Sequence, residues 1–310
     1  MSLIEEAAKR LEQLRRAGVT TAADRHESRA DARPDARPLS RAELRPPEAV
    51  AISVHGLPPK AATAARNVTV DVKRLAGQGF VVPGGPRSAA ADEFRVIKRP
   101  LLANAFGLGV PAVKNGNLIM VTSAMPHEGK TFTAVNLAFS IADELDRTVL
   151  LIDADVARPG LPALFGLSST RGLLDALQNR SMDVGQFMLP TDIANLTILP
   201  GGTQTPRATE LLASDGMARM LEEMAKRYAD RIIVCDAPPL LATTEARVLA
   251  AHMGQIVFVV HAEATLQAQV VQGLATIENC PVKLLVLNMV ESRAQGAHGY
   301  GYGYGYGYGA

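Results

Sequence analysis

The chain has 310 residues, of which 47% are hydrophobic, so it is long enough to bury a large core. Its 32 basic and 31 acidic residues nearly cancel, so the overall charge does not indicate a nucleic-acid partner or an anionic membrane surface. The two cysteines lack metal-ligand or redox spacing, and no stretch has the pattern of a signal peptide or of a membrane span. We therefore expect a cytoplasmic protein, which a partner must hold if it works at the inner face of a membrane.

Residues 1–18 are predicted to form a short amphipathic helix. Ser2 and Glu5 form a capping box, apolar residues follow at helical spacing, and Gly18 can end the helix. Because isolated helices of this length are marginal in water, the segment should pack either on its own domain or on a partner. The sequence favours neither.

Residues 19–87 are expected to be a largely disordered linker. Arginines recur every four residues from Arg25 to Arg45, but four prolines interrupt the helix that would align them. Interleaved acids nearly cancel this charge, so an anion-binding arginine stripe is the minor alternative. The later segment "VTVDVKRLAGQGFVV" has the pattern of a strand and turn.

Residues 88–293 show apolar runs that alternate with helix-like segments. The predicted strands are residues 118–122, 148–153, 196–200, 231–236, 255–260 and 284–288. Runs that are apolar throughout, spaced by helices, predict an α/β fold with a parallel sheet covered on both faces, as in P-loop NTPases. Ligands of such sheets bind at the carboxyl ends of the strands.

The first of these strands leads into "SAMPHEGKT" and then into a helix, which is the context of a phosphate-binding loop. Lys130 is placed to reach the β- and γ-phosphates, and the Thr131 hydroxyl to bind Mg²⁺. The full G-x-x-x-x-G-K-[ST] pattern is not met, because Ala124 replaces its first glycine. The residues predicted to contact ATP are Pro126, His127, Glu128, Gly129, Lys130, Thr131, Phe132, Arg158 and Asn288. Asn288, at the end of a late strand, could contact adenine, and a strand-end turn is the alternative for it.

Carboxylates follow two further strands. Asp153 and Asp155 end the strand in "LIDADVARPGL", and together they could hold a metal, take a proton, or do one each; a solvated turn is the alternative. Asp236 ends the strand in "IIVCDAPPL", where it could orient water or Mg²⁺. Three strand ends thus converge on one predicted site for magnesium and ATP.

These three motifs resemble, in order and spacing, the Walker A, Walker A′ and Walker B motifs of the bacterial tyrosine kinases that control exopolysaccharide synthesis. The similarity runs from about residue 89 to the C-terminus and includes "ELLAS" at 210–214; the opening residues and "DEFRVIKRPLLANAF" look like the subtype found with exosortase genes. The resemblance implies catalytic roles for Lys130, Asp153 and Asp155, and magnesium ligands at Thr131, Asp155 and Asp236. Which aspartate serves the phenol and which the metal stays open.

The last segment, residues 294–310, carries tyrosines at every second position. Glycine at the alternate positions argues against a packed strand, so we expect a flexible tail. The resemblance makes its tyrosines phosphate acceptors, within one subunit or between two, whereas a low-complexity segment for stacking is the alternative. The predicted acceptors are Tyr300, Tyr302, Tyr304, Tyr306 and Tyr308.

Two departures from the family are visible. His127 stands where the loop usually has glycine, and the oligomerisation motif E-x-x-R-x-x-R is represented by Asp92, Arg95 and Lys98. The resemblance implies a homo-oligomer, with a ring as its form, a separate membrane-embedded polysaccharide co-polymerase that activates the kinase, and a tyrosine phosphatase. No nucleic-acid partner is expected.

Two other functions are compatible with a P-loop at this position. A switch ATPase of the partition or division-site type shares the fold, but its signature lysine is absent from "SAMPHEGKT" and the tail has no role in it. A non-catalytic scaffold would bind nucleotide poorly because of His127.

Overall fold

The computed structural model describes residues 67–167, 170–179 and 181–291. The predicted amphipathic helix, most of the predicted linker and the tyrosine tail lie outside these described residues.

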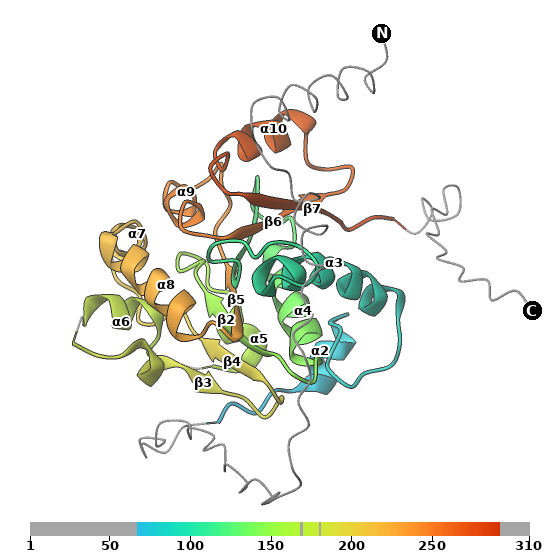
Figure 1. Ribbon diagram of the computed structural model, residues 1–310, viewed down its shortest axis with the longest axis horizontal. Coiled ribbons are helices and arrows are strands. Elements are labelled where there is room, and N and C mark those ends of the chain that lie inside the picture. Colours follow the sequence, from blue (N-terminus) through green and yellow to red (C-terminus); the bar gives the residue numbers. More distant parts are fainter. Residues whose placement is uncertain (1–66, 168–169, 180, 292–310) are drawn as a thin grey trace, which may run out of the picture. The chain divides into compact units, whose positions relative to one another are not determined.

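A seven-stranded sheet forms the centre of the domain, as predicted (Figure 1). Every neighbouring pair of strands is parallel except the first, in which β3 runs against β4. In spatial order the strands are β3 (Leu189–Pro190), β4 (Leu196–Leu199), β2 (Thr148–Asp153), β5 (Arg231–Asp236), β1 (Leu118–Ser123), β6 (Gln255–His261) and β7 (Val282–Asn288). The two-residue β3 was not predicted, because so short a strand has no readable periodicity.

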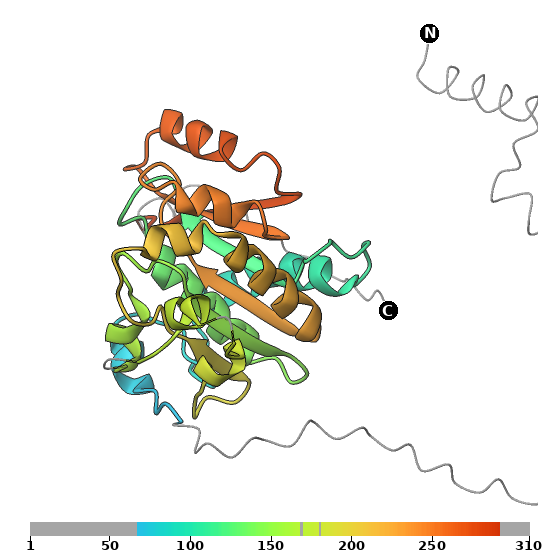
Figure 2. The same ribbon diagram turned by 90° about the vertical axis from the view of Figure 1, so that its left-hand side faces the viewer.

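Helices cover both faces of the sheet. One face carries α2 (Val72–Gly77), α3 (Ala89–Phe106), α4 (Lys130–Ala142) and α5 (Leu161–Phe165). The other carries α6 (Leu173–Gln178), α7 (Ala208–Leu212), α8 (Asp215–Arg227), α9 (Glu245–Ala250) and α10 (Gln267–Ala275), together with the 3₁₀ helix η2 (Val184–Phe187). In Figure 2 the yellow and orange helices of this second face lie in front of the strands.

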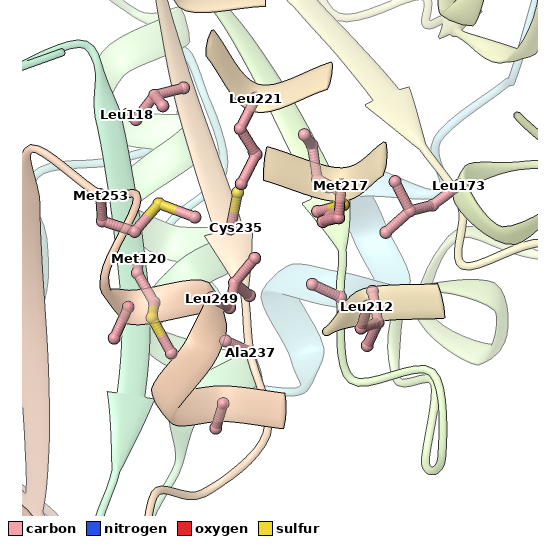
Figure 3. Close-up of a cluster of buried hydrophobic side chains, with 14 of the residues drawn as sticks. Leu118, Met120, Leu173, Leu212, Met217, Leu221, Cys235, Ala237, Leu249 and Met253 are labelled. Atoms are coloured by element: carbon pink, nitrogen blue, oxygen red, sulfur yellow. The ribbon is translucent and has the colours of Figure 1, made fainter. Parts of the chain in front are cut away.

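Two hydrophobic cores lie on either side of the sheet. Alternate residues of β1 point to opposite faces, so Leu118 and Met120 join one core while Ile119 and Val121 join the other. Figure 3 shows the first core, in which Met120 and Met253 pack beside Leu249 of α9. Because both faces of the central strands are buried, the middle residues of these strands are apolar on both faces and do not alternate with polar ones.

The folded domain begins earlier than the sequence predicted. Val70 and Leu75 are buried in the core under α4, and Val68 forms a bridge to Thr191 beside β3. The segment predicted as a strand and turn contains the helix α2, whose start is capped by Asp71. A six-residue helix with one buried side chain gives little local signal, so only its tertiary contacts reveal it.

Among the residues described above, no helix is both long enough and apolar enough to cross a membrane.

Candidate nucleotide-binding site

The predicted phosphate loop connects β1 to α4 at the carboxyl edge of the sheet. Gly129 has a φ of 90° and His127 a φ of 67°, so both residues adopt the left-handed conformation that turns the chain into the helix. Helix α4 begins at Lys130, and its first N–H groups have no partner within the helix. This is the arrangement that binds phosphate at a helix N-terminus.

A cleft of about 680 Å³ opens beside this loop. The predicted residues that line it are Pro126, His127, Gly129, Lys130, Thr131, Phe132, Asp155 and Arg158. Five further lining residues were not predicted: Ala157, Pro239, Ala242, Thr243 and Met289. Three of these lie in the loop after β5, and the proline pair in "CDAPPL" was the one sequence signal that could have indicated it.

Asp153 and Asp236 lie opposite each other on the neighbouring strands β2 and β5, and both side chains are fully buried. The amide of Leu161 donates to Asp153 Oδ2 at 3.1 Å. Within the described part of the chain, Asp153 Oδ1 and both oxygens of Asp236 have no hydrogen-bond partner. Two adjacent buried carboxylates therefore have unused acceptor atoms.

Burial raises the pKa values of these acids. The pKa of Asp236 rises to about 7, mainly through burial, although the nearby Thr131 hydroxyl and the charge of Lys130 oppose the rise. The pKa of Asp153 lies well above its usual range because of burial and then repulsion from Asp236. A cation placed between the two acids would favour their ionised forms.

Asp155 and Lys130 lie at the wall of the cleft. Both are nearly buried, with 8% and 7% exposure, and both line the cavity. Burial raises the pKa of Asp155, while the charge of Lys130 lowers it. Asp155 is the carboxylate of the Asp153–Asp155 pair that a ligand in the cleft can reach.

The donor atoms fit Mg²⁺. The described residues contain no cluster of three or more His, Cys, Asp and Glu side chains able to hold a metal. They do offer the Thr131 hydroxyl near Asp236, whose unused oxygens are the hard ligands that Mg²⁺ prefers. Magnesium usually completes its shell with water and substrate phosphates, so few protein ligands suffice.

Glu128 and Asn288 are placed differently from the other predicted residues. The Glu128 carboxylate is buried and accepts hydrogen bonds from Met125 N at 2.8 Å and from the Thr265 hydroxyl. The Asn288 side chain donates to the carbonyl of Glu128 at 3.0 Å. Neither residue lines the cleft, and at this end of β7 the lining residue is Met289. A contact between Asn288 and adenine stays a prediction.

The three residues predicted for oligomerisation do not share one surface. Asp92 and Arg95 are exposed on α3 and form an ion pair at 2.6 Å. Lys98 is buried, with its ammonium 2.6 Å from Glu144, which follows α4. Lys98 therefore joins α3 to the end of α4 within one subunit, because its long side chain reaches inward from a helix that packs on the sheet.

With this fold and site, the chain can be compared with known proteins. The family model ParA, described as "NUBPL iron-transfer P-loop NTPase", matches residues 114–300. The tyrosine-protein kinase YwqD of Bacillus subtilis is 30% identical over 217 residues, which cover 69% of this chain and 87% of YwqD. The tyrosine-protein kinase Wzc of Salmonella typhimurium is 28% identical over 231 residues, 74% of this chain but 31% of Wzc.

The kinase domain of the Escherichia coli tyrosine kinase ETK has the same fold, with a TM-score of 0.56 at 24% identity, over 76% of this chain and 94% of that domain. The fold and site thus define a P-loop NTPase of the ParA class. Within that class, the chain belongs to the family of bacterial tyrosine-protein kinases, as its motifs predicted. It spans about a third of the length of Wzc.

Proposed function

We propose that the protein is an ATP-dependent protein-tyrosine kinase that phosphorylates its own C-terminal tyrosines. The observation that carries this proposal is the cleft in which Lys130, Thr131 and Asp155 come together from two strand ends, in a chain similar to YwqD along most of the length of that kinase. The five tyrosines after residue 299 supply acceptors on the same chain.

The residues divide the work of phosphoryl transfer. Lys130 would neutralise charge on the γ-phosphate, while Thr131 and Asp236 would hold Mg²⁺, which lowers the charge of the transferred group when bound. Asp155, which lines the cleft, would take the proton of an incoming phenol, whose ordinary pKa is near 10. Asp153 is buried beside Asp236 on the neighbouring strand, and the two would carry negative charge at the sheet edge once a bound cation favours their ionised forms.

The test is the intact mass of the purified chain after incubation with MgATP. We expect several added phosphates, which disappear in a Lys130→Met variant and in a chain truncated after Gly299. ADP release without a gain in mass would refute autophosphorylation and favour a switch ATPase. Absence of MgATP binding would favour a scaffold.

We further propose, from the resemblance, that this activity regulates the polymerisation or export of an exopolysaccharide. The same resemblance supports a homo-oligomer, a membrane-embedded co-polymerase as activator and a tyrosine phosphatase that resets the tail. Autophosphorylation measured with and without the co-polymerase tests the activator, and deletion of residues 1–47 tests the N-terminal segment as its contact. Unchanged activation in the deleted chain would exclude that segment.

A further inference from the structure

One residue of the phosphate loop, Glu128, has its charged group turned away from the cleft. Glu128 is only 4% exposed, and a carboxylate this buried needs hydrogen-bond donors. Both donors to its carboxylate are uncharged: the Met125 amide, 2.8 Å from Oε2, and the Thr265 hydroxyl, which donates to Oε1. Glu128 thus connects two residues within the phosphate loop and connects the loop to Thr265, which lies 137 positions further along the chain.

Thr265 has a fixed orientation. Its hydroxyl oxygen accepts a hydrogen bond from the His261 amide at 3.0 Å, and the Thr265 amide donates to the His261 carbonyl at 3.0 Å. The hydroxyl proton is therefore left for Glu128. A directed chain of part-buried hydrogen bonds runs from the end of β6 to the phosphate loop, and the members of such a chain polarise one another.

A second connection reaches the same residue from β7. Asn288 Nδ2 donates to the Glu128 carbonyl, and the Asn288 carbonyl accepts from the Ala262 amide at 2.9 Å. The Asn288 nitrogen lies 2.0 Å from the point where a Cβ on Gly129 would stand. Glycine is needed at position 129 both for its positive φ and for this close approach.

We propose that Glu128 is a positioning residue that holds the phosphate loop in its nucleotide-binding conformation. It does so through the Glu128 clasp, which comprises Glu128, Met125, Thr265 and Asn288. The clasp does not line the cleft, so it acts on binding and not on the transferred group. The ligand it serves is the nucleotide of the proposed function, and loss of the clasp should raise the Kd and KM for MgATP while leaving kcat nearly unchanged.

The test compares three full-length variants by calorimetric titration with MgATP. Thr265→Val keeps the shape of the side chain but removes the hydroxyl, and we expect about tenfold weaker binding, as for loss of a hydrogen bond to a charged group. Thr265→Ser keeps the hydroxyl and should bind as the wild type does. Thr276→Val is the matched control, because Thr276 directly follows α10 and its hydroxyl donates to the carbonyl of Gly273 within that helix, away from the phosphate loop.

Urea unfolding shows whether each variant retains the fold. If Thr265→Val does not fold, Glu128→Gln takes its place, since it keeps the size and one acceptor oxygen. Wild-type affinity in the folded Thr265→Val chain, failure of Thr265→Ser to restore it, or a fall in kcat at unchanged Kd would each overturn the proposal. Because affinity is measured directly, a wild-type chain that binds MgATP without phosphorylating tyrosine would refute the proposed function and leave the clasp testable.

Discussion

At the scale of single residues, the site contains two aspartates whose carboxyl groups are buried with oxygen atoms that lack hydrogen-bond partners among the described residues. Asp153 and Asp236 are buried side by side with unused oxygens, and burial raises the pKa of Asp236 to about 7. A stable fold without function would replace such a pair by residues with satisfied hydrogen bonds. The pair therefore lowers the free energy of unfolding, and a cation that binds the folded state would raise it again.

This loss of stability has a predictable pH dependence in the protein without nucleotide or magnesium. An aspartate in the unfolded chain has a pKa near 3.9, so between about pH 4 and 7 the folded state binds the proton and the unfolded state does not. The free energy of unfolding should fall as the pH rises through this window, by up to roughly 4 kcal/mol for Asp236. Asp236→Asn should flatten the fall and raise stability at pH 8.

Urea unfolding at pH 5, 6, 7 and 8 checks the prediction, with magnesium chelated. Equal pH slopes in the variant and the wild type would contradict it. The variant should also lose magnesium-dependent activity, so stability and function should change in opposite directions.

His127, in the phosphate loop, has a backbone conformation that is unfavourable for a residue with a side chain. Its φ of 67° costs a side-chain-bearing residue about 1 kcal/mol, whereas glycine adopts it freely. We expect His127→Gly to bind MgATP several-fold more tightly, because His127 lines the cleft and its removal lets the loop backbone approach the phosphates without a Cβ in between. Stability should change little, since the greater freedom of the unfolded chain offsets the relieved strain. Calorimetric titration measures both variants.

The control is His127→Ala, which keeps a Cβ at the same φ and should not gain affinity. Equal gains in the two variants would show that the imidazole, and not the Cβ, hinders binding. Weaker binding in His127→Gly would show that the imidazole itself contacts the nucleotide.

At the scale of elements, the junction of α3 with α4 depends on a buried ion pair. Lys98 on α3 contacts Glu144 and also donates to the carbonyl of Ser140 on α4. Arg99 contacts the same glutamate at 3.3 Å from a more exposed position. The helix that follows the phosphate loop is thus fixed at its far end by α3.

Lys98→Ala should destabilise the domain by about 2–4 kcal/mol, because it leaves Glu144 half-paired in a largely buried position. Lys98→Met should cost less, since it keeps the packing volume. Urea unfolding measures both. Light scattering of the same samples tests the oligomer: unchanged stability with a smaller assembly would place Lys98 in an intersubunit contact and contradict the internal role.

At the scale of the whole molecule, charge on the tail should control assembly. The chain has a net charge of +1, and each phosphotyrosine adds about −1.5 to −2 charges. Five modified tyrosines would add roughly −8 to −10 charges, and repulsion between such tails should favour dissociation of an oligomer. The molar mass by light scattering should therefore fall after full phosphorylation, and the effect should weaken in high salt.

The truncated chain that ends at Gly299 is the control, and its mass should not respond to MgATP. An oligomer whose size is the same before and after phosphorylation would contradict the prediction.

Much of this molecule could be predicted from its sequence. The runs at 148–153 and 231–236 became strands with those bounds, because a short apolar stretch between polar ends suits a strand buried on both faces. Lys130, Asp155 and Asp236 meet because parallel strands present their carboxyl ends at one edge. The motifs were thus predicted to lie at one edge, and the observed strand order, with β5 between β2 and β1, makes them neighbours there.

Only the tertiary structure decided the direction in which the side chains around that edge point. Glu128 follows His127 in the phosphate loop, but its distant partners are Thr265, after β6, and Asn288, on β7. No local sequence pattern predicts these contacts. Lys98 keeps the spacing of a surface motif and is nevertheless buried, because Glu144 lies beneath it. Local sequence indicates the longer strands and the motifs at their ends, whereas packing between distant segments decides which short elements form, which charged groups face the ligand and which hold the fold.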